Sequence, residues 1–141
     1  MKVYNCYFDG ACEPRNPDGN MGVGVYITEG QNVFEWSDFH KEKIGNTNNI
    51  AEYLAVIKIL ELLKNKKSET IQIYGDSKLV IEQLSGRWKI KVGQYVPYAQ
   101  KARELLLEIK KNNTVGLHWI PREQNQKADD LSKAHLMKIN Q

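Results

Sequence analysis

Hydrophobic and polar residues follow two different periods along the chain, and these predict where strands and helices lie. Near the start, three stretches are rich in β-branched and aromatic residues and are separated by turn residues, which is typical of consecutive antiparallel strands. Glycines, prolines and asparagines mark the turns between them. We predict strands at 3–8, 22–28 and 33–40, a turn region at 10–22 and a hairpin turn at 29–32.

From Thr47 onward the apolar residues recur every three or four positions, which predicts helices. The first helix begins near Thr47 and ends at the lysines of 64–67. Its apolar face is formed by Ile50, Tyr53, Leu54, Ile57, Leu60 and Leu63. Further along, we predict a strand at 71–74, a helix at 77–84, a helix at 98–111, a strand at 115–120 and a helix at 125–136.

The order of these elements predicts an α/β fold. Strands that are connected through helices pair in parallel, because the connection returns the chain to the starting end of the sheet. We therefore expect one mixed five-stranded sheet, with three antiparallel strands followed by two parallel ones, and helices on both faces. The length of 141 residues fits a single domain, 1–141.

Composition excludes several classes of protein. Hydrophobic residues make up 41% of the chain, too many for a disordered protein. No apolar run approaches the ~20 residues of a membrane helix, and the first residues lack the apolar segment of a secretion signal. Cys6 and Cys12 would lie about 20 Å apart on an extended strand, beyond the reach of a disulfide. We expect free thiols, a reducing cytoplasmic compartment and no membrane association.

The net charge of +3 is unevenly distributed. Residues 1–76 contain 8 Lys and Arg against 11 Asp and Glu, for a net charge of −3. Residues 77–111 contain 8 against 3, for a net charge of +5. An acidic first half and a basic middle suggest two different roles, although a solvated basic helix face would produce the same count.

Four acidic residues stand where a carboxylate is unusual. Asp9 and Asp76 each follow an apolar strand segment, and burying a carboxylate there is costly unless it is paired or binds a metal. Glu52 lies in the first turn of the long helix, and Asp129 in the first turns of the last one. Taken singly, the two aspartates after strands could cap turns, and the two helical acids could favour helix N-termini.

Taken together, the four acids predict a metal site. In an open sheet with parallel central strands, ligands bind outside the carboxyl ends of the strands. Four carboxylates gathered there repel one another unless cations bind, and an oxygen-rich cluster suits Mg²⁺ or Mn²⁺. Two such ions support in-line cleavage of a phosphodiester without a Ser or Cys nucleophile.

The motifs that contain these acids resemble those of type 1 ribonuclease H, in the shorter variant without the full basic protrusion. They are Tyr7-Phe8-Asp9-Gly10-Ala11-Cys12, Asn16-Pro17, Thr47-Asn48-Asn49-Ile50-Ala51-Glu52-Tyr53, Gly75-Asp76-Ser77 and Asn125-Gln126-Lys127-Ala128-Asp129-Asp130-Leu131. They span nearly the whole chain. The resemblance implies the mixed sheet inferred above and an endoribonuclease that hydrolyses the RNA strand of RNA–DNA hybrids, leaving a 5′-phosphate and a 3′-hydroxyl.

By this resemblance, the catalytic metal ligands are Asp9, Glu52, Asp76 and Asp129. They would hold two Mg²⁺ ions, with Mn²⁺ able to substitute. The family pattern Asn-x-x-Ala-Asp-x-Leu selects Asp129 over Asp130, which would point about 100° away on the helix.

Arg122 lies near the place where many relatives carry a loop histidine. It would stabilise phosphate charge or steer the leaving group, but a guanidinium cannot act as a general base. We expect His118, which lies inside a predicted strand, to be structural.

The resemblance also implies residues that bind the hybrid. They are Gly10, Cys12, Asn16, Thr47, Asn48, Asn49, Ser77, Trp88 and Lys89. The asparagines match family positions near the nucleic acid backbones, where polar side chains read 2′-hydroxyls in the minor groove. Thr47 and Asn48 lie at a helix N-terminus, where a phosphate binds readily, although helix capping would explain them too.

Many relatives carry an extra basic helix and loop that contacts the hybrid. The stretch between Ser85 and Tyr98 is too short for it. The basic residues around Trp88 are expected to be a reduced substitute whose affinity falls with salt. The alternative is a core tryptophan flanked by solvated lysines.

Two other functions stay open on the sequence. A resolvase-like or integrase-like nuclease of the same fold would cut DNA with similar acids, and a non-catalytic module would bind hybrids without cutting them. None of the four acids is missing and we expect no further domain for target choice, so the hybrid-specific ribonuclease is favoured. We expect a monomer whose partner is an RNA–DNA hybrid, with no protein partner.

Overall fold

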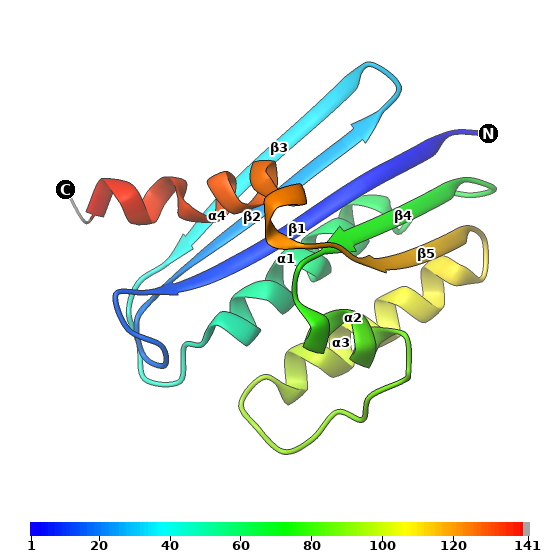
Figure 1. The fold of residues 1–141 in the computed structure, drawn as a ribbon. Coiled ribbons are helices and arrows are strands. Elements are labelled where there is room, and N and C mark those ends of the chain that lie inside the picture. Colours follow the sequence, from blue (N-terminus) through cyan, green and yellow to red (C-terminus); the bar gives the residue numbers. More distant parts are fainter. Residues whose placement is uncertain (140–141) are drawn as a thin grey trace.

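Five strands form one mixed sheet with helices on both faces (Figure 1). The computed structural model describes residues 1–139. The strands, in the spatial order β3-β2-β1-β4-β5, are β1 (Val3–Glu13), β2 (Asn20–Glu29), β3 (Asn32–His40), β4 (Thr70–Gly75) and β5 (Thr114–Trp119). β2 pairs antiparallel with β1 and β3, whereas β4 pairs parallel with β1 and β5. The predicted topology is confirmed.

Four α-helices flank the sheet. They are α1 (Asn48–Leu63), α2 (Lys78–Leu84), α3 (Val96–Lys110) and α4 (Gln126–Ile139), and a short 3₁₀ helix η1 (Arg122–Gln124) precedes α4. α1 packs against β1 and β2 with α3 beside it, and α4 crosses β1, β2 and β3 on the opposite face (Figure 1). None of the helices described is long and apolar enough to cross a membrane.

α1 is buried on more sides than its predicted apolar face. Ala51, Ala55, Val56 and Ile59 lie outside that face and are nevertheless buried. The reason is that α1 is packed between the sheet and α3, so it has two contact surfaces instead of one. This environment also takes Glu52 into the interior, with only 9% of the residue exposed.

The predicted turn region at 10–22 was too long at both ends. Residues 10–13, assigned to a turn because of the nearby glycine and prolines, continue β1, residues 20–21 begin β2, and the turn occupies 14–19. Residues 10–13 form a strand because β2 pairs with them residue by residue, from Gly10 opposite Val23 to Glu13 opposite Asn20. The hydrogen-bonded ladder outweighs the local turn preference. Asp9 therefore lies inside a central strand instead of following one.

Candidate metal centre

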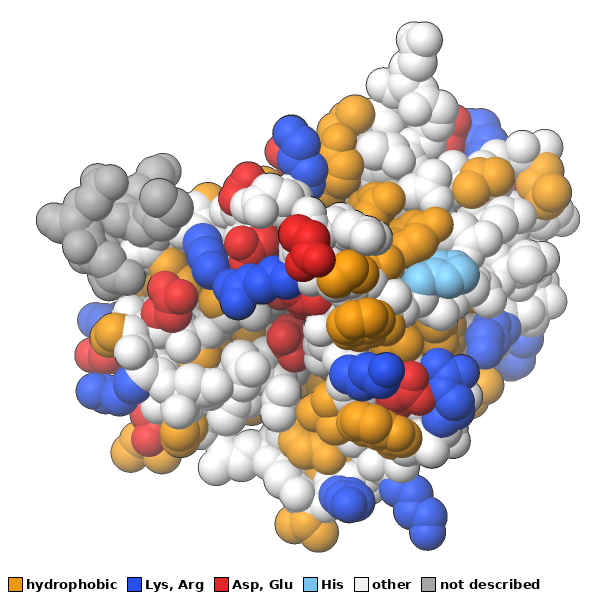
Figure 2. Space-filling view, in the orientation of Figure 1, with side chains coloured by type: hydrophobic (Ala, Val, Ile, Leu, Met, Phe, Trp, Pro, Cys, Tyr) orange, Lys and Arg blue, Asp and Glu red, His pale blue; other side chains and the backbone are white. Residues whose placement is uncertain are grey.

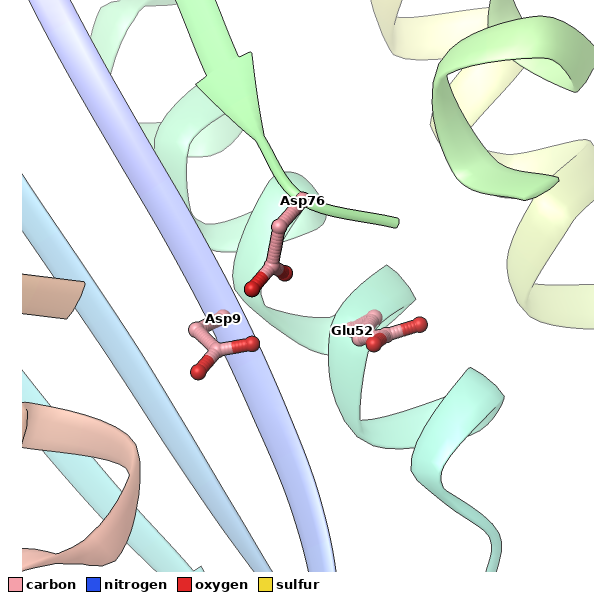
Figure 3. A group of neighbouring side chains, drawn as sticks. All are labelled: Asp9, Glu52 and Asp76. Atoms are coloured by element: carbon pink, nitrogen blue, oxygen red, sulfur yellow. The ribbon is translucent and has the colours of Figure 1, made fainter. Parts of the chain in front are cut away.

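Two neighbouring parallel strands bring Asp9 and Asp76 together. The pairing of β1 with β4 ends at Phe8 opposite Gly75, so the two aspartates are the next residues on each strand. Figure 3 shows their side chains and that of Glu52, which comes from α1, around a common space. One carboxylate oxygen from each of these three acids lies within 4.8 Å of the other two.

A glycine next to Asp9 allows α1 to approach β1 closely. A Cβ atom built on Gly10 would overlap the backbone nitrogen of Glu52 and the carbonyl carbon of Ala51. Only glycine fits at such a contact between backbones. Because of this contact, α1 lies directly against the strand that contains Asp9, and Glu52 reaches the same space. Glu52 was predicted in the first turn of this helix, but α1 begins at Asn48 and its first turn contains no acid, so Glu52 lies in the second turn.

Asp129 reaches this space from the opposite helix, α4. Asn125 is 1% exposed, and its Nδ2 donates a hydrogen bond to the carbonyl oxygen of Phe8 at 2.9 Å. Ser132 is fully buried, and its hydroxyl lies 3.3 Å from Oδ2 of Asp9. These contacts hold the first turns of α4 against β1 at the acids. Asp130 is exposed, as the helical spacing predicts, and it accepts a hydrogen bond from the side-chain amide of Gln126.

All four acids line one open cavity of about 440 Å³. Its lining consists of Asp9, Gly10, Ala11, Cys12, Glu13, Asn48, Glu52, Asp76, Trp119, Arg122, Asp129 and Lys133. Seen on the molecular surface, acidic side chains occupy the centre of this face, with basic side chains beside them (Figure 2). The tertiary structure thus places side chains from β1, α1, α4 and the ends of β4 and β5 in one site.

Four lining residues were not predicted from the sequence: Ala11, Glu13, Trp119 and Lys133. The last two contact the acids. Trp119 ends β5, and its Nε1 donates a hydrogen bond to the carbonyl oxygen of Asp76 at 3.1 Å. Lys133 Nζ lies 3.5 Å from Oδ1 of Asp129. Lys133 follows Asp129 by four residues, so helical spacing alone could have identified it. For Trp119 the only signal was its position at the end of the last strand.

The residues predicted to bind the hybrid occupy different places. Gly10, Cys12 and Asn48 line the cavity. Asn16 lies beside it, because its Nδ2 donates a hydrogen bond to Oδ1 of Asn48 at 2.8 Å. Asn49 is half-buried in the first turn of α1 and does not line the cavity.

The remaining predicted residues have other surroundings. Thr47 and Ser77 cap α1 and α2 by accepting hydrogen bonds from the amides of Ile50 and Val80. Trp88 and Lys89 line a separate groove beside α2. Trp88 is 45% exposed, which excludes the alternative that it is a core tryptophan.

Burial and mutual repulsion raise the pKa values of three acids. Burial, followed by the charge of Asp76, raises the pKa of Asp9 to about 8. Burial also raises the pKa of Glu52 to about 8, although the Ser77 hydroxyl partly opposes this. The pKa of Asp76 is raised by burial and lowered in part by the charge of Arg122. Ionising the whole cluster is therefore costly without a cation.

The available ligands fit a hard divalent cation. All are carboxylate oxygens, which Mg²⁺ and similar ions prefer. Oδ1 of Asp129 is buried and has no hydrogen-bond partner within the described part of the chain. Its closest cationic neighbours are Lys133 and Arg122, at 3.5 and 3.6 Å. A divalent cation at the cluster would stabilise a buried carboxylate oxygen in this condition.

Without metal, the acids should make the protein less stable as the pH rises from about 4 to about 8. Asp9 and Glu52 have pKa values near 4 when unfolded and about 8 when folded, so the folded state binds more protons throughout this range. The stability that the folded state gains from these protons is largest below pH 4 and is lost as the pH rises past 8. Thermal unfolding in EDTA at several pH values measures this effect.

The matched variant for this measurement is Glu52→Gln, which removes one of the acids whose pKa is raised. The difference in Tm between the variant and the wild type should grow in favour of the variant between pH 5 and pH 8. Adding Mg²⁺ should raise the Tm of the wild type more at pH 8 than at pH 5. A difference in Tm that does not change with pH would contradict the assigned shifts.

The chain is similar over most of its length to several known proteins. Residues 7–135 match a family model described as reverse transcriptase-like. The chain is 35% identical over 135 residues to ribonuclease HI of Halobacterium salinarum, covering 94% of this chain and 63% of that protein. It is 30% identical over 143 residues to ribonuclease H of Clostridium botulinum, covering 99% and 81%.

Other relatives are longer. A bifunctional protein of Mycobacterium tuberculosis is 32% identical over 125 residues, and the chain spans 33% of its length. Among solved structures, RNase H1 of Halobacterium salinarum superposes with a TM-score of 0.80 at 31% identity, covering 96% of this chain and 98% of that one. LC11-RNase H1, solved in complex with an RNA/DNA hybrid, superposes with a TM-score of 0.83 at 28% identity, covering 98% and 99%.

Proposed function

The chain belongs to the ribonuclease H family, and on that premise we propose that it hydrolyses the RNA strand of RNA–DNA hybrids, leaving a 5′-phosphate and a 3′-hydroxyl. The observation that carries the proposal is the cluster of Asp9, Glu52 and Asp76, with oxygens within 4.8 Å of one another in an open cavity. The similarity to a relative solved with an RNA/DNA hybrid supports the choice of substrate.

We propose that Asp9, Glu52, Asp76 and Asp129 hold two divalent cations, Mg²⁺ with Mn²⁺ able to substitute. Bound there, the ions supply the Lewis acidity that phosphodiester hydrolysis requires. Neighbouring side chains hold the acids in place. The hydroxyl of Ser132 donates a hydrogen bond to Asp9, and the indole of Trp119 donates one to the carbonyl oxygen of Asp76.

Basic residues at the rim of the cavity are proposed to contact the substrate phosphates. Arg122 lies 3.6 Å from Asp129, and its charge partly offsets the rise in the pKa of Asp76, so it acts on two of the four acids. A guanidinium does not release its proton at neutral pH, so Arg122 stabilises phosphate charge and does not act as a base. Lys133 adds a second cation at the same rim.

The other proposed contacts extend from the cavity to the neighbouring surface. Asn16 and Asn48 form a pair of amides at the entrance, suited to backbone groups and 2′-hydroxyls. Below the acids, basic and hydrophobic side chains alternate over α2 and the segment after it (Figure 2). There Trp88 and Lys89 are proposed to bind the hybrid. The further proposed contacts are Gly10, Cys12, Thr47, Asn49 and Ser77.

We also propose that residues 1–141 act as one monomeric catalytic domain in the cytoplasm. The family match over 7–135 supports one domain. Cys6 and Cys12 are buried and free, which is typical of proteins in a reducing compartment. Light scattering of the purified protein tests the monomer, and a molar mass of twice 16.3 kDa would exclude it.

The proposed function is tested by a panel of labelled substrates in Mg²⁺ and in Mn²⁺. The panel contains an RNA–DNA hybrid, duplex RNA, duplex DNA and duplex DNA with a single ribonucleotide. We expect cleavage of the hybrid, intact duplex DNA and poor cleavage at the single ribonucleotide. Cleavage of DNA with the hybrid left intact would favour a DNA nuclease. Tight hybrid binding without cleavage in either metal would favour a non-catalytic module.

The adjacent aspartates of α4 provide a matched pair of variants. Asp129→Asn should reduce hybrid cleavage about 10-fold to 100-fold, because it removes one of the four carboxylates that line the acidic cavity. Asp130→Asn changes an exposed side chain and should leave kcat within about twofold. Steady-state cleavage at saturating Mg²⁺ measures both. Equal losses in the two variants would show that the family pattern selects the wrong acid.

A further inference from the structure

The basic segment after α2 has no regular secondary structure. Between Ser85 and Tyr95 the chain forms neither a helix nor a strand. Within this segment Arg87, Trp88, Lys89 and Lys91 line a groove of about 520 Å³ beside α2. A segment without its own hydrogen-bond ladder needs contacts with the rest of the protein to keep its side chains in place.

A buried glutamine of α2 provides these contacts. Gln83 is 1% exposed. Its Nε2 donates hydrogen bonds to the carbonyl oxygen of Lys89 and to the hydroxyl of Tyr95, both at 3.1 Å. The same Tyr95 hydroxyl accepts a hydrogen bond from the amide of Lys91 at 3.2 Å. Gln83 therefore holds the backbone on both sides of residue 90, directly and through Tyr95.

The same glutamine is hydrogen-bonded to α1, the helix that contains Glu52. The hydroxyl of Tyr53 in α1 donates a hydrogen bond to Oε1 of Gln83. Tyr53 is fully buried, directly follows Glu52, and its ring stacks on that of Tyr95 at 6.2 Å between centroids. The amide of Gln83 thus connects three parts of the protein: α1 beside an acid of the cluster, α2, and the basic segment.

The beginning of the segment is also held by hydrogen bonds to Glu82 of α2. The amide of Trp88 donates a hydrogen bond to the carbonyl oxygen of Glu82, and the guanidinium of Arg87 pairs with the Glu82 carboxylate. The Arg87–Glu82 pair is largely exposed on the arginine side, so it contributes little. Further along, the side chain of Ile90 packs against the hydrophobic core, and the polar contacts of the backbone on either side of it are those with Gln83 and Tyr95.

We propose that Gln83 is a positioning residue for substrate binding: it holds the segment 87–91 so that its cations face the hybrid while Glu52 and its partners face the scissile phosphate. The proposal rests on the proposed function. It predicts that losing the Gln83 amide weakens hybrid binding and leaves the chemical step unchanged, because no atom of Gln83 lines the acidic cavity.

The test uses two variants that remove the network from different sides. Gln83→Met keeps the side-chain length and removes the amide, and Tyr95→Phe keeps the ring that stacks on Tyr53 and removes only the hydroxyl. Each should raise the KM for hybrid about fivefold to tenfold and leave kcat within about twofold. The salt dependence of hybrid binding should also weaken, with a slope smaller by about one. Gln100→Met, the same change at an exposed position of α3, is the control and should alter nothing.

A second readout does not depend on activity. In both variants, amide hydrogen exchange should become faster between residues 86 and 95 and stay unchanged in α1 and β4. If Gln83→Met does not fold, Tyr95→Phe decides the result. Unchanged KM and unchanged exchange in a folded variant overturn the proposal, as does a fall in kcat at constant KM.

The failure of this proposal can be told apart from the failure of the proposed function. A wild-type protein that does not cleave hybrids in either metal overturns the proposed function. The proposal about Gln83 is then judged on exchange and on hybrid binding measured by fluorescence anisotropy. Faster exchange together with binding weakened severalfold supports it, and either one without the other overturns it.

Discussion

Replacing Asp9 with asparagine should abolish the cleavage of RNA–DNA hybrids, with kcat falling about 10³-fold or more. Asp9 is 6% exposed, and one of its carboxylate oxygens lies within 4.8 Å of an oxygen of Asp76, which directly follows β4, and of an oxygen of Glu52 on α1. An amide at this position removes one negative charge from the ligand set and offers a single neutral oxygen. Metal ions supply several kcal/mol to phosphodiester cleavage, and each 1.36 kcal/mol corresponds to about tenfold in rate.

The same substitution should leave the fold intact and remove the response to metal. Because Asp9 is buried beside other acids, its neutral replacement relieves repulsion, so the metal-free Tm at pH 8 should be at least that of the wild type. Added Mg²⁺ should raise the Tm of the wild type and much less that of Asp9→Asn. Single-turnover cleavage and thermal unfolding measure both effects, with Asp130→Asn as the control. Full metal-dependent cleavage by the variant would refute the assignment of the site.

Replacing Gly10 with alanine should damage both stability and activity. The added methyl group would overlap the backbone of Ala51 and Glu52, so α1 must move away from β1. Forcing extra volume into a packed contact with backbone costs about 3 kcal/mol. A displacement of Glu52 by about 1 Å can reduce the rate about 10²-fold, since the acids must hold a defined geometry.

Denaturant unfolding and hybrid cleavage together test the role of Gly10. Gly116→Ala is the matched control, because its methyl group would meet the ends of the Gln72 and His118 side chains, which can move, instead of backbone. We expect the control to lose less than about 1 kcal/mol and to keep its cleavage rate. If Gly10→Ala were as stable and active as the control, the close contact between β1 and α1 would not be what places Glu52.

The sequence pattern predicted an element correctly where the element contacts the rest of the protein through a single face. The predicted strands at 33–40 and 71–74 and the predicted helix at 98–111 depend on residues close to one another in the chain, and the structure confirms them to within two residues. The pattern was less informative for α1, which contacts the sheet and α3 at once. It was wrong for residues 10–13, where pairing with β2 outweighs a turn-rich composition.

By itself, the sequence determined the order of strands and helices. It also determined which strands pair parallel and which antiparallel, and which four acids stand in unusual positions. These follow from periodicity and from the cost of burying a carboxylate, both of which are local. The tertiary structure alone decided that Asp9 and Asp76 meet at the end of one parallel ladder, that Gly10 admits Glu52, and that Gln83 joins α1 to the basic segment. Each of these is a contact between residues distant in sequence, and such contacts depend on register and close packing, which no local pattern records.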